Sequence, residues 1–221
     1  MVSTQRGRLI SFEGSEGCGK STQIALLAEA LQAAGKQVLT LREPGGTYIG
    51  EQLRHLLKHD TKAGQMCAEA ELLLFAASRA QLVREVIVPA LAAGTYVLCD
   101  RFLDSTTVYQ GVARKLDTSA VAAINAFAVG DVLPDLTFIL DLPADLGLQR
   151  AQTRAPDTSD RMEQEGDAFY QSVRSGYLLL AKEAERSQRP SRFVLIGAHG
   201  LPEAIHRKIL AEVKLRLDLG Q

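Results

Sequence analysis

The sequence predicts one α/β domain that comprises residues 1–221 and is built on a doubly wound parallel sheet of about five strands. Three observations predict this fold class. Short runs of almost continuous apolar residues recur along the chain, as expected of strands that are buried on both faces. Helical patterns separate these runs, which is the order of elements that produces a parallel sheet. A glycine-rich loop joins the first run to the first helical pattern, as in many sheets of this class.

The expected strands and helices follow each other in a regular order. The strands are residues 9–12, 38–41, 96–99, 136–140 and 193–196. A helix should follow the first strand and end at Gly35, because four apolar residues recur at helical spacing: Ile24, Leu27, Ala28 and Leu31. Further helical patterns cover residues 68–91, with an interruption near Pro89, and residues 119–129. A C-terminal helix should bury the face that carries Ile205, Ile209 and Val213.

Composition and charge limit the classes of partner. Hydrophobic residues make up 46% of the chain, and the net charge of −1 gives no basic field for nucleic acid or a membrane surface. The N-terminus lacks the hydrophobic region of a signal peptide, and no apolar run approaches the ~20 residues that span a bilayer. The scattered Cys18, Cys67 and Cys99 suit a reducing compartment and indicate neither a disulfide framework nor a zinc site. We therefore expect a cytoplasmic protein.

The glycine-rich loop has the pattern Gly-x-x-x-x-Gly-Lys-Ser, which wraps the phosphates of a nucleoside triphosphate. Its residues are Gly14, Ser15, Glu16, Gly17, Cys18, Gly19, Lys20 and Ser21. The glycines let successive N–H groups turn inward as an anion nest, and the helix that follows directs its positive end at the same phosphates. Lys20 can then reach the β- and γ-phosphates, and the Ser21 hydroxyl can bind Mg²⁺. The pattern predicts a site for ATP or GTP.

Charged residues follow three of the expected strands, where open parallel sheets bind ligands. Arg42 follows the second strand in a Pro-Gly-Gly turn, and its planar guanidinium suits a phosphate dianion. Asp100 follows the third strand in the pattern that places a carboxylate near Mg²⁺, and Asp141 ends the fourth strand in the same way. On this criterion alone the two aspartates compete.

The sequence argues against a GTPase and favours a small kinase. The only asparagine, Asn125, precedes Ala126, so the guanine-reading Asn-Lys-x-Asp pattern is absent. None of the eighteen glycines has an aspartate three positions earlier, so the switch pattern Asp-x-x-Gly is absent too. A neutral chain of this length offers little surface for an ATP-driven machine. A kinase needs two anion sites and movable arginines to neutralise the transferring group.

The segment from Asp100 to Gln110 resembles the signature of the thymidylate kinases. The similarity extends over nearly the whole chain and includes the Arg-Glu-Pro-Gly-Gly-Thr run that begins at Arg42 and the Phe-x-x-x-Arg pattern at Phe75 and Arg79. It implies the fold of a P-loop nucleoside monophosphate kinase, a homodimer, and transfer of phosphate from ATP to dTMP with Mg²⁺. A kinase for another nucleoside or nucleoside monophosphate, and a nucleotide-binding regulatory module without turnover, remain alternatives.

The resemblance also implies roles for particular residues. Phe75 would stack on thymine, and Arg79, one helical turn away, would donate to a ring carbonyl. Arg42 and Arg101 would hold the acceptor phosphate. Thr106 and Tyr109 would line the pocket near the base and the sugar.

Acidic and basic residues of the loop and of a late polar segment complete the expected site. The resemblance makes Glu16 an acceptor-side or Mg²⁺-linked carboxylate beside Ser21 and Asp100. Residues 150–166 would form a lid that supplies Arg150, Arg154 and Arg161 to the transferring phosphate, together with Lys20 and Arg101. Such a lid also keeps water from the reaction.

Overall fold

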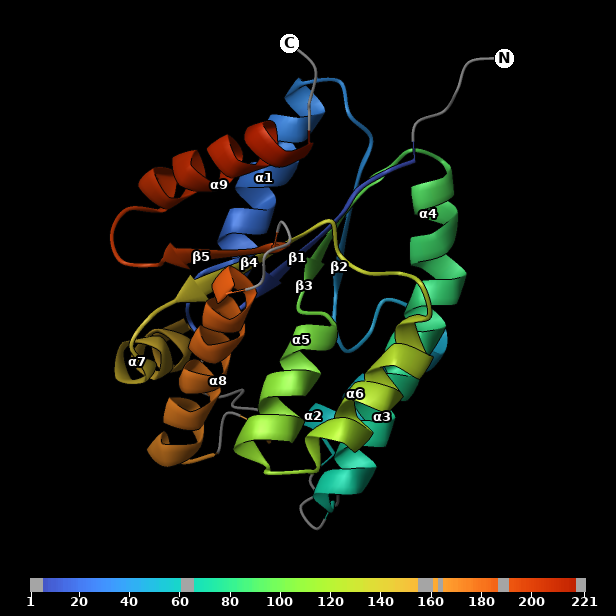
Figure 1. Cartoon of the computed structure of the whole chain (residues 1–221), viewed down its shortest axis with the longest axis vertical. Helices are drawn as coiled ribbons and strands as arrows, with labels where there is room; N and C mark the ends of the chain where they lie inside the picture. Colours follow the sequence, from blue (N-terminus) through green and yellow to red (C-terminus); the bar gives the residue numbers. More distant parts are fainter. Residues whose placement is uncertain (1–5, 61–65, 155–160, 163–164, 187–190, 218–221) are drawn as a thin grey trace.

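The computed structural model describes residues 6–60, 66–154, 161–162, 165–186 and 191–217. At its centre is a parallel sheet of five strands in the order β2-β3-β1-β4-β5 (Figure 1), which confirms the predicted fold class. The strands are β1 (Leu9–Glu13), β2 (Val38–Arg42), β3 (Tyr96–Asp100), β4 (Leu136–Asp141) and β5 (Phe193–Gly197). Each strand includes one residue more at its carboxyl end than the apolar runs predict. Four of these five added residues are polar or charged, so the ladder itself carries functional side chains to the edge of the sheet.

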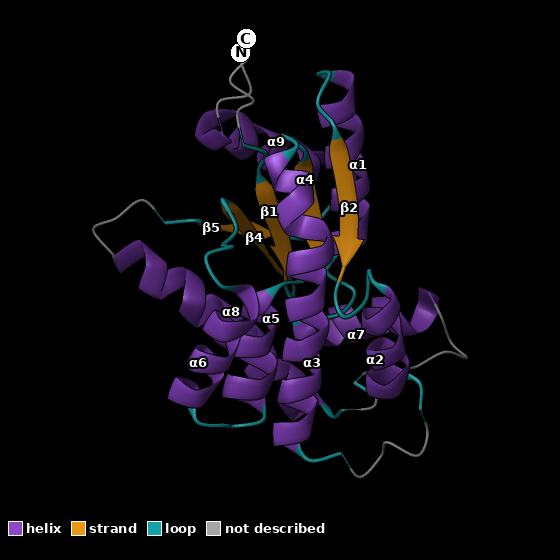
Figure 2. Cartoon of the chain, turned by 90° about the vertical axis from the view of Figure 1, so that its right-hand side faces the viewer, coloured by secondary structure: helices purple, strands orange, loops and turns teal. Residues whose placement is uncertain are grey.

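Helices cover both faces of the sheet (Figures 1 and 2). They are α1 (Lys20–Ala33), α2 (Tyr48–Lys58), α3 (Ala68–Leu82), α4 (Val88–Ala92), α5 (Leu103–Thr106), α6 (Thr118–Val129), α7 (Ala144–Arg154), α8 (Asp167–Arg186) and α9 (Pro202–Leu217), with π-helical segments η2 (Val83–Ile87) and η3 (Thr107–Ala113). Figure 1 shows α1 and α9 together on one side of the sheet and α4 on the other. In the described residues, none of the helices is both long enough and apolar enough to cross a membrane.

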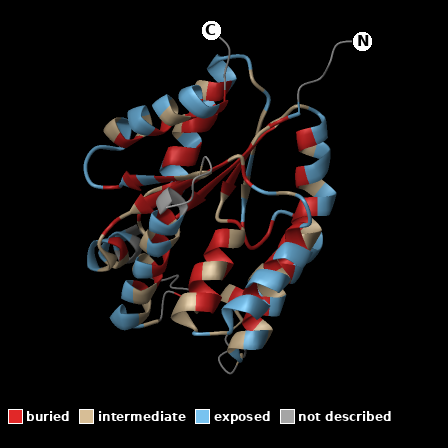
Figure 3. Cartoon of the chain, viewed as in Figure 1, coloured by how far each residue is buried: buried red, intermediate tan, exposed pale blue. Residues whose placement is uncertain are grey.

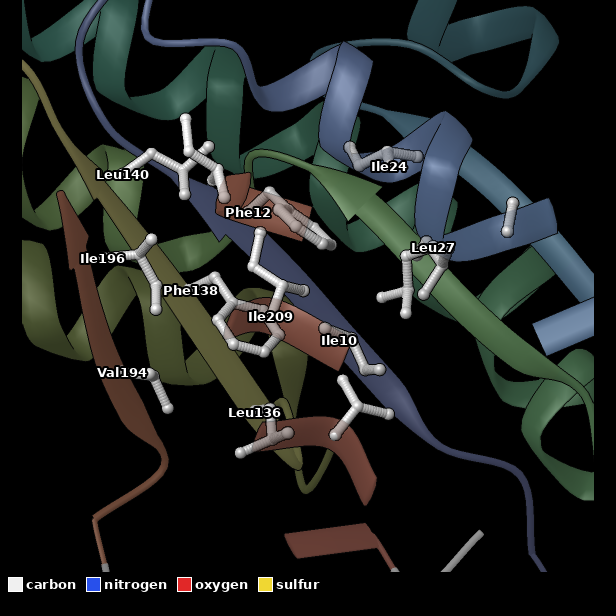
Figure 4. Close-up of a cluster of buried hydrophobic side chains, with 14 of the residues drawn as sticks. Ile10, Phe12, Ile24, Leu27, Leu136, Phe138, Leu140, Val194, Ile196 and Ile209 are labelled. Carbon is white, nitrogen blue, oxygen red and sulfur yellow. The ribbon is translucent and has the colours of Figure 1, made fainter. Parts of the chain in front are cut away.

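A cluster of buried apolar side chains fills the core between the sheet and the pair α1 and α9 (Figure 4). The rings of Phe12 and Phe138 lie 5.3 Å apart between their centroids, and Leu27 of α1 and Ile209 of α9 close over them. All of the apolar positions that predicted α1 and α9 are buried. Burial is concentrated in the inner strands β1, β3 and β4 and in the inward helix faces (Figure 3), so the middle of the carboxyl edge stands on a rigid base. The edge strands β2 and β5 are partly exposed, so the expectation that every strand is buried on both faces is wrong for these two.

The expected interruption near Pro89 is a widening of the helix rather than a break. Proline has no N–H to donate to the preceding turn. The chain passes from α3 through the π-helical segment η2 directly into α4, where Pro89 occupies the first turn. The sequence did not predict α2, α8, or the helical run formed by α5 and η3.

Candidate active site

The phosphate-binding loop, residues 14–21, joins β1 to α1 at the carboxyl edge of the sheet. Gly14, Gly17 and Gly19 have backbone φ angles of 136°, 67° and 94°, which residues with a Cβ rarely adopt. The Lys20 ammonium is buried and donates to the carbonyl oxygens of Gly14 at 3.3 Å and Ser15 at 2.9 Å. The loop therefore has the strand-loop-helix placement that a nest for phosphate requires.

Gly17 is also the point where the first half of α7 touches the loop. A Cβ on Gly17 would collide with the carbonyl oxygen of Gly147, and a Cβ on Gly147 would collide with the carbonyl oxygen of Glu16. Backbone therefore packs on backbone between the loop and the helix that carries Arg150 and Arg154. Only glycine permits this approach at both positions.

The two aspartates at the strand ends differ in their partners. The Ser21 hydroxyl donates to Asp100 Oδ2 at 2.7 Å, because β3 lies beside β1 in the sheet. Asp141, at the end of β4, instead accepts two hydrogen bonds from Arg174 of α8, at 2.7 Å and 3.0 Å. The geometry thus brings Asp100, and not Asp141, to the hydroxyl of the loop.

Ser21 and Asp100 offer the hard oxygen atoms that Mg²⁺ prefers. The described residues contain no group of three or more His, Cys, Asp or Glu side chains arranged to hold a metal. Mg²⁺ in kinases needs no such group, because it keeps several waters and takes its other ligands from the substrate phosphates. A hydroxyl and a carboxylate at the mouth of the loop therefore fit this ion.

Arg101 has a strained backbone that its neighbours hold in place. Its φ angle is 71°, in the left-handed region. Its N–H donates to Phe12 O at 3.0 Å, and the N–H of Phe102 donates to Glu13 Oε1 at 2.7 Å. These bonds from β1 fix the turn after β3, so the guanidinium is directed toward the phosphate-binding loop.

The Arg101 guanidinium joins the loop to the pocket beside it. It pairs with Glu16 at 2.7 Å and donates to Tyr109 Oη at 3.0 Å and to Gly14 O at 3.0 Å. Burial by itself would raise the pKa of Glu16, but the charges of Arg101 and Lys20 lower it to about 2. Glu16 is therefore an anion at any physiological pH.

A pocket next to this ion pair contains most of the residues expected to bind the substrate. Its lining includes Glu16, Phe75, Arg79, Arg101, Thr106 and Tyr109. These residues come from the loop, α3, the turn after β3, α5 and η3, and all face one hollow. Phe75 is half-buried and forms an apolar part of the wall, as a platform for a base requires.

Arg79 is more deeply buried than a base-reading arginine needs to be. Its side chain is 1% exposed and pairs with Glu43, which is also buried. Its five N–H groups are all engaged, with Glu43 Oε2, Thr106 Oγ1, Asn125 Oδ1 and Phe102 O. A ring carbonyl in the pocket would have to replace one of these acceptors. Glu43 Oε1 is buried and has no hydrogen-bond partner among the residues that the structure describes.

The remaining predicted residues lie elsewhere or are only partly described. Arg42 is exposed at the end of β2, pairs with Glu51 at 3.1 Å and does not line the pocket. Arg150 is exposed on α7, and the side chain of Arg154 lies outside the described residues. Arg161 points at α3, where it pairs with the buried Glu71 at 2.5 Å and donates to Leu57 O at 3.0 Å. Most of the expected lid, residues 155–160 and 163–164, also falls outside the described residues.

Sequence reasoning missed several residues of the pocket. Glu43, Ser105 and Gln110 line it, and Tyr177 of α8 donates to Glu13 behind Arg101. Glu43 stands within the Arg-Glu-Pro-Gly-Gly-Thr run, so that motif could have indicated it. No local pattern marks Tyr177, because its contacts lie 72 to 164 residues away in sequence.

Comparisons with known proteins agree with this geometry. A family model of thymidylate kinase matches residues 12–209. A thymidylate kinase of Chlorobium chlorochromatii is 48% identical over 220 residues, which cover 96% of each chain. One of Alcanivorax borkumensis is 44% identical and covers 92% of this chain and 94% of its own. The crystal structure of a thymidylate kinase from Ehrlichia chaffeensis, 34% identical, superposes with a TM-score of 0.74 and covers 94% of this chain and 99% of that one.

Proposed function

Because the chain belongs to the thymidylate kinase family, we propose that residues 14–21 hold the phosphates of ATP and that the pocket beside them holds dTMP. The enzyme phosphorylates dTMP to dTDP with ATP, a step of dTTP synthesis. One observation carries the assignment of the two sites. Arg101 bonds to the loop on one side and lines the pocket on the other, so a single cation can meet both the donor and the acceptor phosphate.

The chemistry needs positioning and charge stabilisation rather than a base. An oxygen of the dTMP phosphate is already a nucleophile and attacks the γ-phosphorus of ATP, while the bond to the β-phosphate oxygen breaks and ADP leaves. Lys20 and Arg101 stabilise the charge on the transferring group, and the lid arginines Arg150, Arg154 and Arg161 add to them. Arg42 pairs with Glu51 and lies outside the pocket, so it would have to leave Glu51 in order to hold the acceptor phosphate.

Mg²⁺ would be held by Ser21 and Asp100. Glu16 would lie on the side of the site that binds dTMP, as a carboxylate linked to the ion. The ion supplies neutralisation of the β- and γ-phosphate oxygens. The short bond from Ser21 to Asp100 supports this assignment, because the same two oxygens would turn toward the ion. Asp141 has no part in it, since Arg174 occupies both of its oxygens.

The base would lie against Phe75, with its polar edge toward Thr106 and Arg79. Thymine and uracil present carbonyl acceptors at this edge, whereas cytosine presents an amino donor. A donor that faces a buried, charged donor leaves both unpaired, which costs about 1–3 kcal/mol. We expect dCMP to lose at least about tenfold in kcat/KM against dTMP, and dUMP to remain a weak substrate.

We also propose that the enzyme is a cytoplasmic homodimer. The helices α3 and α6 are neighbours (Figure 1) and expose large apolar side chains: Phe127 is 85% exposed and Leu73 is 56% exposed. Exposed patches of this kind are typical of protein interfaces. In the described residues, Cys18, Cys67 and Cys99 are free thiols, which suits the cytoplasm.

The test of the proposed function is an ADP-release assay with ATP and each common nucleoside monophosphate in turn. The expected result is that dTMP has the highest kcat/KM, with dUMP next and with dCMP and the purine nucleotides far behind. A different monophosphate at the head of the series would indicate a kinase for another nucleotide. ATP binding without turnover of any monophosphate would indicate a regulatory module.

A further inference from the structure

Glu13, the last residue of β1, has a fully buried carboxyl group directly behind Arg101. Its Oε2 lies 2.6 Å from Ser105 Oγ and 2.9 Å from Tyr177 Oη. The two hydroxyl oxygens are themselves 2.9 Å apart. Three oxygens from β1, α5 and α8 therefore form a closed triangle in which every side has the length of a hydrogen bond.

The triangle needs three hydrogens, and the hydroxyl groups supply two. Ser105 and Tyr177 carry one hydroxyl hydrogen each. If Glu13 is a carboxylate, one side of the triangle brings two oxygens together with no hydrogen between them. If Glu13 is protonated, its own hydrogen completes a ring in which each oxygen donates once and accepts once.

The surrounding charges are already paired without Glu13. Arg101 pairs with Glu16, and Arg192 pairs with Asp104, both at 2.7 Å. In the described part of the chain, no cation lies within ion-pair distance of Glu13. An ionised Glu13 would therefore be a buried charge with no cationic partner in direct contact.

Titratable groups surround Glu13 on every packed element. They are Cys99 of β3, Arg101 after it, Asp104 of α5 and Tyr177 of α8. Burial, followed by the charge of Asp104, raises the pKa of Glu13 to about 7, although Arg101 and the bonds from Ser105 and Phe102 oppose the shift. The hydrogen that the triangle of oxygens lacks and the raised pKa both indicate that Glu13 holds a proton near neutral pH.

The same two hydroxyl groups connect Glu13 to the substrate side. Arg101 Nη1 donates to Ser105 Oγ at 3.1 Å and lies 3.3 Å from Tyr177 Oη. Loss of the proton would place a negative charge two hydrogen bonds behind the guanidinium. It would also leave Ser105 and Tyr177 with both hydroxyl hydrogens turned toward Glu13.

We propose that Glu13 is a positioning residue whose protonated form holds Ser105, Tyr177 and Arg101 ready for the phosphate dianion of dTMP, and whose ionisation weakens dTMP binding. This inference rests on the proposed role of Arg101 at the acceptor phosphate. The repulsion between a carboxylate and the dianion is the physical cause of the weakening.

The test compares the dTMP dissociation constant of the wild type with that of Glu13→Gln between pH 5.5 and 8.5, by titration calorimetry. Glutamine has the size of the protonated acid and does not ionise. The phosphate of dTMP titrates in the same way in both experiments, so the ratio of the two constants isolates Glu13. We expect the ratio of wild type to variant to rise roughly fivefold or more over this range. Asp135→Asn, which removes a carboxylate at the opposite end of the sheet, should give a ratio independent of pH.

A second measurement reports the proton independently of dTMP. In the folded state the raised pKa keeps a proton that the unfolded chain loses, so the free energy of unfolding should fall as the pH rises from about 4.5 to about 7. Urea denaturation of Glu13→Gln should lack that part of the slope. Should this variant fail to fold, Ser105→Ala opens the triangle instead and should weaken the pH dependence of dTMP binding.

A ratio that stays constant with pH, or equal slopes in the two unfolding series, would overturn the proposal. Neither result would touch the proposed function, which fails only if dTMP is neither bound nor phosphorylated by the wild type. If the unfolding free energy of the wild type depended on pH as expected while the ratio of dTMP dissociation constants stayed constant, Glu13 would hold a buried proton that has no effect on the substrate. The positioning role would then be wrong.

Discussion

We expect Lys20 to serve the ligand more than the fold, even though its side chain is buried. Its ammonium group bonds to two loop carbonyls and lies 3.6 Å from Cys18 Sγ, so its stem helps to close the loop. We expect Lys20→Ala to lower kcat about 10²–10³-fold, since one donor to the transferring phosphate is lost. The measurement is ADP release with dTMP, with Tm as the check on folding. Lys208→Ala, on the exposed side of α9, is the matched control; near-normal turnover of Lys20→Ala would contradict the assignment of the loop.

We expect Phe75, which lines the pocket, to provide the apolar surface on which the base stacks. Phe75→Ala should weaken dTMP and dUMP together by about 1–3 kcal/mol, the usual worth of a stacked base on an aromatic ring. The measurement is kcat/KM for both nucleotides. Leu215→Ala removes a large apolar side chain that is 78% exposed on α9, outside the pocket and the proposed dimer face, and should leave kcat/KM unchanged. A loss confined to dTMP would mean that Phe75 contacts the methyl group instead of the ring face.

Arg79 has a structural role, so we expect its substitution to lower the stability of the fold before any effect on base recognition can be measured. Arg79→Ala would leave Glu43 as a buried carboxylate without its cation, so we expect a loss of about 3–5 kcal/mol in the free energy of unfolding. Urea denaturation measures this loss. The double variant Arg79→Met with Glu43→Gln removes both charges and should recover most of the stability.

The same pair bears on base choice. If Arg79 reads the base edge, the double variant should also narrow the dTMP-to-dCMP ratio of kcat/KM. An unchanged ratio in a stable double variant would assign base selection to Thr106 and its neighbours.

At the scale of elements, the contact between Arg161 and α3 raises the question whether the arginines of residues 150–166 act on the transferring phosphate or only pair with Glu71. Glu71 accepts bonds from Gln110, Arg114 and Arg161. We expect the double variant Arg154→Ala with Arg161→Ala to lower kcat by as much as about 10³-fold, and more than it weakens dTMP binding. Arg114→Ala shares Glu71 but lies outside the segment, so it is the matched control. Equal effects of the double variant and the control would mean that the segment acts only through Glu71.

The elements that the sequence predicts well are those whose signal is local. The five strands are apolar runs, and the face of α1 is a four-residue pattern. The segment of α5 and η3 contains Ser105, Thr106, Thr107 and Val108, which have low helix propensity, and tertiary packing overrides it. The burial of Arg79 depends on Glu43, 36 residues away, and the position of Arg161 depends on Glu71, 90 residues away. A pattern along the chain does not contain such pairs.

At the scale of the whole molecule, the exposed apolar faces of α3 and α6 should form the dimer interface. From residue 120 onward, every exposed residue of α6 is apolar: Ala120, Ala122, Ala123, Ala126 and Phe127. We expect Phe127→Glu to convert the dimer to a monomer, because it places a charge at the centre of that face. Light scattering coupled to gel filtration gives the mass. Leu195→Glu, on the edge strand β5, is the control; a dimer that survives Phe127→Glu would place the interface elsewhere.

The contact between Gly17 and Gly147 has a mechanical consequence. The two backbones touch here without side chains between them, so this is the point at which α7 is held closest to the loop. At a rise of about 1.5 Å per residue, Arg150 stands about 4.5 Å along the axis from this point and Arg154 about 10.5 Å. If α7 turned about this point, the backbone at Arg154 would move more than twice as far as the backbone at Arg150, so we expect ligand binding to displace the end of α7 more than its middle.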